Sequence, residues 1–232
     1  MLEVHEINTY YGRSHILFNL SLNVEIGEIV CLLGRNGSGK TTTLRSIMRL
    51  TPTQSGSIKL EGMEISKRPA FQIWRMGVGY VPEHRGIFPG LTVHENLWIT
   101  HRPTRGGSGR TIKETYDLFP TLKQLDRRQG DRLSGGQQQM LAIARSLGGN
   151  PKLLLLDEPS TGLSPLVLRD LGEKIEGFRE RKIAILLAEQ NVKFAMDIGH
   201  RVYILNKGEI SYEGTTAELQ HRKDLMKKYL GV

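Results

Sequence analysis

A glycine-rich segment carries the residues best suited to chemistry in this chain. It reads Gly34-Arg35-Asn36-Gly37-Ser38-Gly39-Lys40-Thr41. Glycines at these positions let the backbone wrap tightly, so that consecutive N–H groups point at phosphate oxygens. Lys40 would supply a positive charge for the β- and γ-phosphates, and the Thr41 hydroxyl is placed to bind Mg²⁺. The segment therefore predicts a phosphate loop that binds ATP, and a plain glycine-rich turn is the disfavoured interpretation.

An acidic pair follows the apolar run at 153–156. Asp157 is expected to be a further partner of Mg²⁺. Glu158 would then sit beside the γ-phosphate, where a carboxylate orients and deprotonates the attacking water. Standing alone, such a pair would more commonly cap the end of a strand. Its combination with the phosphate loop makes catalysis the favoured interpretation.

A second candidate phosphate contact lies at the start of a predicted helix. It reads Leu133-Ser134-Gly135-Gly136-Gln137, and the apolar residues at 140, 141, 144 and 147 form one helical face after it. Ser134 could simply be an N-cap, which stabilises a helix by about 1 kcal/mol. The two glycines leave the amides open to a phosphate, however. Because the phosphate loop already grips a nucleotide, this second site has an obvious use if it faces the ATP of another subunit.

The strands and helices that must position these residues can be recognised from the spacing of apolar residues. Short apolar runs rich in β-branched residues alternate with helical patterns, which predicts an α/β fold. A buried strand at 29–33 leads into the phosphate loop, and the apolar residues at 44, 47 and 48 predict a helix after it. Further strands are expected at 78–81, 153–156 and 183–187, with a hairpin turn at 206–208.

The middle third of the chain has a helical pattern, and we expect residues 95–145 to form a helical subdomain inserted into a single domain spanning 1–232. This pattern is broken at 102–110 by a segment rich in arginine and glycine. That segment is interpreted as an exposed flexible connection, with a basic phosphate-binding loop as the alternative.

The composition is that of an ordinary soluble domain, with 38% hydrophobic and 24% charged residues. The single cysteine, Cys31, excludes a disulfide framework within the chain. We expect no secretory signal, and the longest apolar runs are too short to cross a bilayer. If the protein serves a membrane, it does so through other chains. The net charge of +8 favours anionic partners, although a well-solvated basic surface is the simpler interpretation.

The order of these motifs resembles that of the ATP-binding-cassette ATPases, and the resemblance extends from residue 2 to residue 231. It implies the fold of the phosphate-loop ATPases: a mixed sheet flanked by helices, an antiparallel β part and an inserted helical subdomain. It also implies a head-to-tail dimer with ATP between the phosphate loop of one subunit and the 133–137 signature of the other. Thr42 would extend the phosphate contacts, and Tyr11 would stack on adenine, unless it is a sheet-edge core residue.

Four positions depart from the usual pattern of that family. Glu83 stands where most members have glutamine, and it can still coordinate Mg²⁺ directly or through water. Gln190 aligns with the switch histidine, and its amide can donate a hydrogen bond to the γ-phosphate but cannot titrate near neutrality. Ser164 stands where many relatives have aspartate, and Arg49 replaces the common glycine at the end of the first helix.

The departures resemble those of one ATPase subunit of the branched-chain amino acid importers. The residues concerned are at 81–83, 88–93, 95–97, 189–191 and 229–231, while 12–17 and 119–120 also resemble urea or short-amide importers. This resemblance implies a peripheral protein at the cytoplasmic face of the inner membrane. Its partners would be a second ATPase subunit, integral membrane permease subunits and, indirectly, an external solute-binding protein.

Three other classes remain open. The same cassette drives exporters and lipid-extraction systems, which usually have glutamine at position 83. A cassette protein acting on DNA or ribosomes would typically carry coiled-coil insertions or tandem cassettes, and because the sequence has neither, no nucleic acid is expected as a partner. A nucleotide-binding module without catalysis is disfavoured, since Lys40, Thr41, Asp157 and Glu158 are all present.

Overall fold

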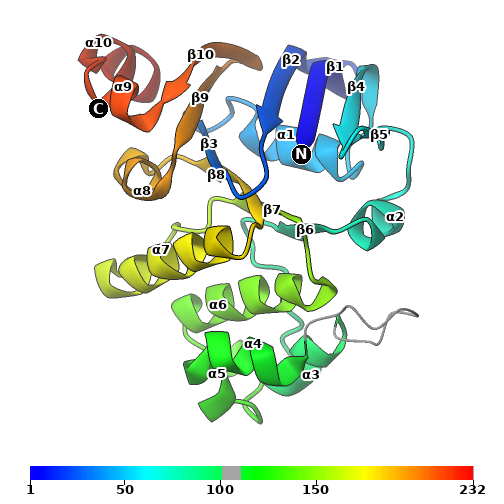
Figure 1. Ribbon diagram of the computed structural model, residues 1–232, viewed down its shortest axis with the longest axis vertical. Helices are drawn as coiled ribbons and strands as arrows, with labels where there is room; N and C mark the ends of the chain where they lie inside the picture. The colour runs from blue at the N-terminus through cyan, green and yellow to red at the C-terminus, as the bar shows by residue number, and fades with distance from the viewer. Residues whose placement is uncertain (101–110, 232) are drawn as a thin grey trace.

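The computed structural model describes residues 1–100 and 111–231, with the antiparallel strands at one end and a group of helices at the other (Figure 1). The segment at 102–110 lies outside the described residues, so its interpretation as a flexible connection stays a prediction.

The strands form two sheets. The first is a four-stranded antiparallel sheet in the order β2-β1-β4-β5, composed of β1 (Leu2–Tyr11), β2 (Ser14–Val24), β4 (Thr53–Leu60) and β5 (Met63–Glu64). The second is a six-stranded sheet in the order β10-β9-β3-β8-β7-β6. It consists of β3 (Ile29–Leu33), β6 (Val78–Val81), β7 (Leu153–Asp157), β8 (Ala184–Glu189), β9 (Arg201–Asn206) and β10 (Glu209–Thr215). Its strands are parallel except for β10, which pairs antiparallel with β9.

The central strands are apolar along their whole length because both of their faces are covered. Every residue of β3, β7 and β8 is buried. Successive side chains of a strand point to opposite faces, and in β3 Ile29, Cys31 and Leu33 join one core while Val30 and Leu32 join the other. The six-stranded sheet therefore separates two hydrophobic cores, as is typical of a buried parallel sheet.

Helices cover both faces of this sheet. They are α1 (Lys40–Ile47), α2 (Ala70–Arg75), α3 (Val93–Trp98), α4 (Ile112–Leu118), α5 (Pro120–Gln124), α6 (Gly135–Ser146), α7 (Pro165–Glu180), α8 (Val192–Ile198), α9 (Thr216–Gln220) and α10 (Lys223–Leu225). Short 3₁₀ turns occupy Gly130–Arg132 and Leu147–Gly149, and a π-helical turn follows at Met226–Leu230. Helix α1 packs into the core shared by the two sheets, whereas α6, α7 and α8 pack into the core on the opposite face.

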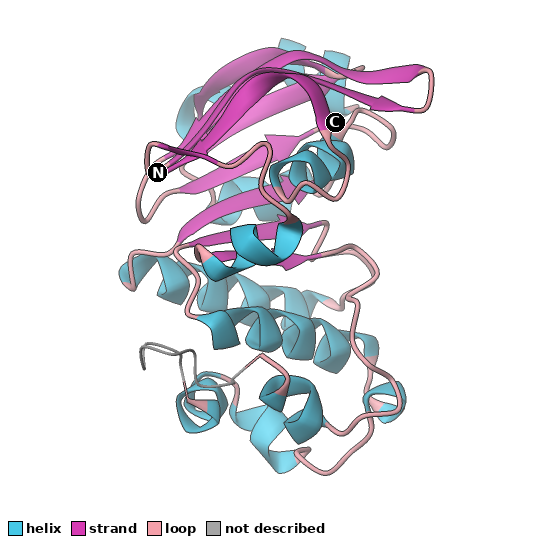
Figure 2. Ribbon diagram, turned by 90° about the vertical axis from the view of Figure 1, so that its right-hand side faces the viewer, coloured by secondary structure: helices cyan, strands magenta, loops and turns pink. Residues whose placement is uncertain are grey.

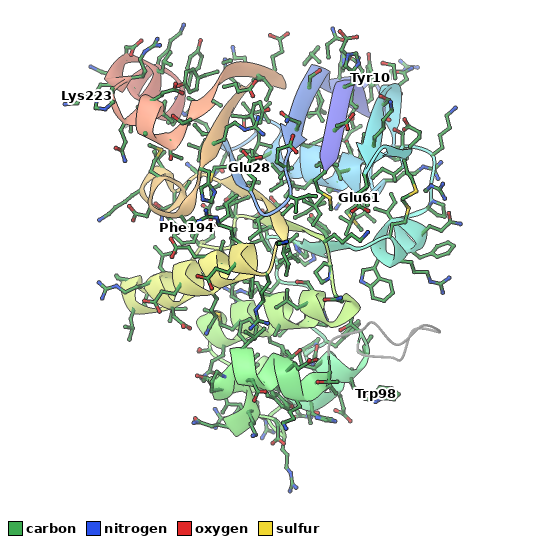
Figure 3. The ribbon with its side chains drawn as sticks, in the orientation of Figure 1. Tyr10, Glu28, Glu61, Trp98, Phe194 and Lys223 are labelled. Carbon is green, nitrogen blue, oxygen red and sulfur yellow. The ribbon has the colours of Figure 1, made fainter. Side chains whose placement is uncertain are left out.

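Helices α3 to α6 lie together at the end of the molecule farthest from the antiparallel sheet. Figure 2 shows the strands of both sheets stacked above this helical half. Among the labelled side chains of Figure 3, Tyr10 lies on the antiparallel sheet and Trp98, the last residue of α3, lies in the helical half. The predicted fold class is thus confirmed. Helices α3 to α6 lie between residues 93 and 146, and the division into a single domain spanning 1–232 with a helical subdomain inserted at 95–145 stays a prediction. Its status as a separately moving subdomain stays a prediction.

Among the described helices, none combines the length and apolar character that crossing a bilayer requires.

Candidate nucleotide-binding site

The strand register brings the predicted phosphate loop and acidic pair to one edge of the six-stranded sheet. Leu33, the last residue of β3, pairs with Glu189 at the end of β8. Asp157, the last residue of β7, pairs with the neighbouring Ala188. The carboxyl ends of three parallel strands therefore meet, and ligands of open α/β sheets bind outside such ends.

The phosphate loop runs from the end of β3 to the start of α1 with glycine at the positions where a side chain is excluded. Gly37 and Gly39 have φ of 77° and 114°, which L-residues rarely adopt, and Gly39 is the N-cap of α1. A side chain at Gly34 would overlap the Ser38 hydroxyl and the carbonyl oxygen of Leu205. The Ser38 hydroxyl is buried without a hydrogen-bond partner in the described chain, which suits a loop shaped around an anion.

The Lys40 ammonium group folds back over this loop. Its Nζ donates hydrogen bonds to the carbonyl oxygens of Gly34 at 2.9 Å and Arg35 at 3.3 Å. It also lies 3.0 Å from Oε1 of Glu158, with the two side chains 4% and 12% exposed. A nearly buried cation is thereby held at the place where the loop would receive a phosphate.

Asp157 lies at the centre of a small hydrogen-bond network. Its Oδ1 accepts a hydrogen bond from the Thr41 hydroxyl at 3.0 Å, and its Oδ2 accepts one from the Tyr80 hydroxyl at 3.2 Å. Burial raises the pKa of Asp157, and the neighbouring carboxylates of Glu158 and Glu83 raise it further. Burial, together with the charge of Asp157, likewise raises the pKa of Tyr80. A bound cation would stabilise the ionised form of Asp157.

The oxygen donors at this edge fit a magnesium ion. Thr41 and Asp157 are already within hydrogen-bond distance of each other, and Glu83 lines the same cleft as Thr41. No group of three or more His, Cys, Asp and Glu suited to a metal occurs in the described ranges 1–100 and 111–231. The Thr41 hydroxyl and the Asp157 carboxylate are donors that suit Mg²⁺, which usually combines one or two protein oxygens with waters and substrate phosphates.

Glu158 has an unusual backbone conformation. Its φ is 46°, in the left-handed region, and its N–H donates to the carbonyl oxygen of Ala188 at 2.9 Å. The Thr161 hydroxyl lies 3.5 Å from Oε2 of Glu158. Strained backbones of this kind concentrate at functional sites, and here the turn directs the carboxylate into the cleft.

A cleft of about 400 Å³ joins these groups. It is lined by Tyr11, Ile16, Asn36, Gly37, Gly39, Lys40, Thr41, Thr42, Glu83 and Glu158. Tyr11, the last residue of β1, is 45% exposed, and its hydroxyl accepts a hydrogen bond from Thr51 at 3.3 Å. The structure thus places the predicted adenine contact, the phosphate loop, Glu83 and Glu158 around one space, together with Ile16, which was not predicted.

Gln190 is not among the residues that line this cleft. It is exposed and follows directly after β8, whereas its neighbour Glu189 is buried. The Glu189 carboxylate accepts hydrogen bonds from the backbone N–H and hydroxyl of Ser160 at 3.0 and 2.8 Å and from the N–H of Asn191 at 3.2 Å. Burial raises the pKa of Glu189, although these hydrogen bonds oppose the shift. Glu189 therefore fixes the loop after Glu158, a role that sequence reasoning missed.

The signature at 133–137 begins α6 and lies outside the cleft lined by Lys40. Ser134 is the N-cap: its N–H donates to Oε1 of Gln137 at 2.9 Å, and its hydroxyl accepts from the Gln137 N–H at 3.3 Å. Gly136 lies against Val167, so that a side chain there would come within 2.8 Å of Cγ1 of Val167. Within one chain, therefore, the two predicted phosphate contacts do not face the same cleft.

The structure explains the positions of two further residues, Tyr80 and Arg49. Tyr80 in β6 holds Asp157, and an aromatic residue with a hydroxyl inside a short apolar strand was its only signal in the sequence. Arg49 follows α1 with a φ of 52°, in the left-handed region that commonly ends a helix. This conformation explains why glycine is common at that position and why Arg49 is strained there.

Comparison with known proteins gives consistent results. A family model described as ABC transporter matches residues 17–161. The high-affinity branched-chain amino acid transport ATP-binding protein BraG of Pseudomonas aeruginosa is 40% identical, and the alignment covers 100% of both chains. The probable branched-chain amino acid transport ATP-binding protein LivF of Archaeoglobus fulgidus is 36% identical over 100% of this chain and 99% of its own. The lipopolysaccharide export system ATP-binding protein LptB of Escherichia coli is 34% identical over 96% of this chain and 93% of its own.

Solved structures have the same fold. A nucleotide-free ATP-binding cassette of an ABC transporter superposes with a TM-score of 0.84 at 22% identity, covering 97% of this chain and 95% of its own. A dimeric ATP-binding cassette in a post-hydrolysis state, bound to ADP and Pi, superposes with a TM-score of 0.82 at 25% identity, covering 93% and 99%.

Proposed function

The chain belongs to the ABC transporter family of ATP-binding proteins, and on this premise we propose that it is the ATP-hydrolysing subunit of an importer for branched-chain amino acids. The observation that carries the proposal is the pairing of Lys40 with Glu158 at 3.0 Å, beside the pairing of Thr41 with Asp157 at 3.0 Å. These contacts support the assignment of a phosphate-binding cation, a general base and a metal-binding pair to one edge of the sheet.

We propose that the triphosphate lies along the phosphate loop. The backbone N–H groups of the loop and of the first turn of α1 would bind the phosphate oxygens, and the dipole of α1 favours their negative charge. Lys40 would exchange its contact with Glu158 for the β- and γ-phosphates. Tyr11 would stack on adenine at the open side of the cleft, and Thr42 would extend the phosphate contacts.

Mg²⁺ would be held by Thr41 and Asp157, with Glu83 binding directly or through water. When bound, the ion neutralises charge on the β- and γ-phosphates. Glu158 would orient a water molecule for in-line attack and accept its proton. Gln190 would donate a hydrogen bond to the γ-phosphate, which requires the loop after β8 to approach the cleft, because Gln190 does not line it in the single chain.

The signature at 133–137, the second predicted phosphate contact, supports the proposal that the chain acts as a dimer. The signature has a satisfied helix cap and two glycines that leave the amides of α6 open, yet it does not line the cleft of its own chain. We propose that Ser134, Gly135, Gly136 and Gln137 complete the ATP site of a second ATPase subunit. The resemblance to a dimeric cassette bound to ADP and Pi supports this arrangement.

Transport would be performed by other chains. ATP-driven closure would move the helical subdomain at 95–145, and this motion would be passed to an integral membrane permease subunit at the cytoplasmic face of the membrane. The external solute-binding protein would interact only with the permease, so that specificity for the solute lies outside this chain. Two relatives are named as branched-chain amino acid transport ATP-binding proteins, and these names support that class of solute.

Two alternatives share the same ATPase chemistry. A urea or short-amide importer fits residues 12–17 and 119–120. A lipid-extraction ATPase is favoured by the 34% identity to LptB of Escherichia coli. Both predict the same cleft and differ in the permease that the chain binds.

The test is to purify the chain from native membranes with its bound subunits and to reconstitute the complex in proteoliposomes. We expect ATP-dependent uptake of labelled leucine, loss of uptake with Glu158→Gln, and no uptake of labelled urea. Uptake of urea alone would establish the amide importer, and co-purification with lipopolysaccharide export components would refute an importer of either kind.

A further inference from the structure

A tight turn joins the nucleotide cleft to the signature helix within one chain. The turn spans residues 82–86, where the N–H of Arg85 donates to the carbonyl oxygen of Pro82 at 2.8 Å. Arg85 has a φ of 64°, so the chain reverses sharply at this residue. Glu83, at the other side of the turn, lines the cleft that contains Lys40 and Thr41.

The Arg85 side chain leaves this turn in the direction of α6. Its Nη1 donates a hydrogen bond to Oε1 of Gln138 at 2.9 Å, and Nε2 of Gln138 donates to the carbonyl oxygen of Gly130 at 3.0 Å. A Cβ atom on Gly135 would lie 3.2 Å from Nη2 of Arg85. The guanidinium group therefore lies against the first turn of α6, and a Cβ atom at Gly135 would displace it by a few tenths of an ångström.

A second contact holds the same segment farther along α6. Nη2 of Arg145 donates to the carbonyl oxygen of Gly86 at 2.7 Å, and its guanidinium lies 5.0 Å from the centre of the Phe88 ring. Arg145 lies two helical turns beyond Gln138 on the same helix. The segment that follows β6 is thus attached to α6 at two points, and Arg85 makes the one nearest the signature.

We infer that Arg85 is a positioning residue that couples the Glu83 side of this chain's own cleft to the signature turn at Gly135. The inference rests on the proposed function, because Gly135 would contact the ATP of a second subunit. A displacement of Glu83 on nucleotide binding would move Arg85, which lies two residues away in the same hydrogen-bonded turn. The guanidinium would transmit this movement to Gly135 and Gln138, so that occupancy of one cleft would orient the contact offered to the other.

The planar guanidinium suits this role better than a single ammonium group. It can donate to Gln138 with one nitrogen while another packs on the glycine backbone, and its geometry is rigid. A methionine of similar length would keep the apolar packing but would lose the charge and the hydrogen bond to Gln138.

The experiment compares two steps in the slow-hydrolysis variant Glu158→Gln, alone and combined with Arg85→Met. Binding of a fluorescent ATP analogue to the dilute single chain reports the cleft itself, and light scattering with ATP reports dimer formation, with and without the sister ATPase subunit. We expect Arg85→Met to leave binding to the single chain unchanged and to weaken dimer formation about tenfold, the effect of losing one charged hydrogen bond.

Two further variants separate positioning from folding. Gln138→Met should also weaken the dimer, and the double variant should lose less than the sum of the two single losses, because both changes remove the Arg85–Gln138 hydrogen bond while Gln138→Met also removes the one to Gly130. Arg127→Met, which removes the same charge from an exposed position, should have no effect. In the intact transporter, Arg85→Met should lower kcat, while Arg85→Lys should restore only part of the loss.

An unchanged dimer in Arg85→Met, additive losses in the double variant, or an equal loss of single-chain binding and thermal stability would each overturn the inference. These results leave the proposed function intact. Failure of the Glu158→Gln chain itself to dimerise with ATP, alone or with its sister subunit, would overturn the proposed function and this inference together.

Discussion

The Lys40 ammonium nitrogen lies 3.0 Å from the Glu158 carboxylate, and the two side chains are 4% and 12% exposed. The residue that would bind the γ-phosphate is therefore neutralised by the residue that would activate water. An incoming phosphate has to displace the carboxylate from Lys40, which frees Glu158 to approach a water molecule. Removing one partner of a buried pair leaves the other charge uncompensated, at a cost of about 3–5 kcal/mol.

This relationship predicts opposite effects of Glu158→Gln on binding and on hydrolysis. Hydrolysis should fall at least about a hundredfold because the general base is lost. ATP should bind at least as tightly, because no carboxylate competes for Lys40 and none repels the γ-phosphate. Single-turnover hydrolysis and equilibrium ATP binding check the two effects. Glu176→Gln, at an exposed position on α7, is the matched control and should change neither. A variant that hydrolyses ATP normally would exclude Glu158 as the base.

The signature serine should have a structural effect and a functional one. Ser134→Ala removes the hydroxyl that accepts from the Gln137 N–H and should destabilise the chain by about 1 kcal/mol. Thr215→Ala removes the equivalent acceptor at α9, where the Glu218 N–H donates to the Thr215 hydroxyl at 3.1 Å. Thermal unfolding should show similar losses for the two variants, but only Ser134→Ala should reduce ATP-driven dimer formation. Equal dimer formation in both variants would leave Ser134 with a capping role alone.

Tyr11 should contribute to ATP binding through its ring rather than its hydroxyl. Tyr11→Ala should weaken ATP binding about tenfold, since stacking on a base contributes roughly 1–3 kcal/mol. Tyr11→Phe should bind ATP normally. Tyr10→Ala is the control, because the Tyr10 ring stacks on His15 with centroids 4.0 Å apart and lies on the other face of β1. Weak binding by Tyr11→Phe would point to the hydroxyl instead.

Gln190 should make turnover insensitive to the titration of an imidazole. The ATPase rate of the reconstituted transporter should show no step near pH 6.5, whereas Gln190→His should introduce a step with a midpoint of about 6.5. Steady-state rates across this range, corrected for stability, provide the measurement. A step already present in the unmodified chain that disappears when a nearby histidine is replaced would contradict the assignment.

Glu189 should make stability depend on pH in a defined direction. Burial raises the pKa of Glu189. As the pH falls toward the ordinary value of a glutamic acid, the folded chain takes up a proton that the unfolded chain does not yet bind, so this group favours folding more at about pH 5 than at about pH 8.

The Glu189→Gln variant lacks this titration. Its stability relative to the unmodified chain should therefore decrease as the pH is lowered, a trend that urea unfolding at several pH values can measure. A relative stability that increases toward acid would mean that the hydrogen bonds from Ser160 and Asn191 outweigh burial and that the pKa is lowered instead.

Local features of this chain were predictable because their conformations depend on neighbouring residues. Glycine at 37 and 39 permits the positive φ that the phosphate loop adopts, and an unbroken apolar run at 29–33 is compatible with a strand buried on both faces. Ser134, as a possible N-cap before an apolar helical face, predicted that a helix begins here, and α6 begins at Gly135. In each case the residues that form the pattern are the same few consecutive residues that adopt the predicted conformation.

Contacts between distant residues were set by strand register and packing, on which short patterns carry no information. The order of β3, β8 and β7 brings Lys40 to Glu158 and Thr41 to Asp157, while Tyr80 from β6 completes the network. The same packing buries Glu189, whose carboxylate accepts a hydrogen bond from Ser160, and leaves its neighbour Gln190 exposed just after the strand. The residue types alone indicated phosphate binding and hydrolysis. Which charged side chains lie together depends on the arrangement of the strands, because an ion pair requires a short distance in space and not a short separation along the chain.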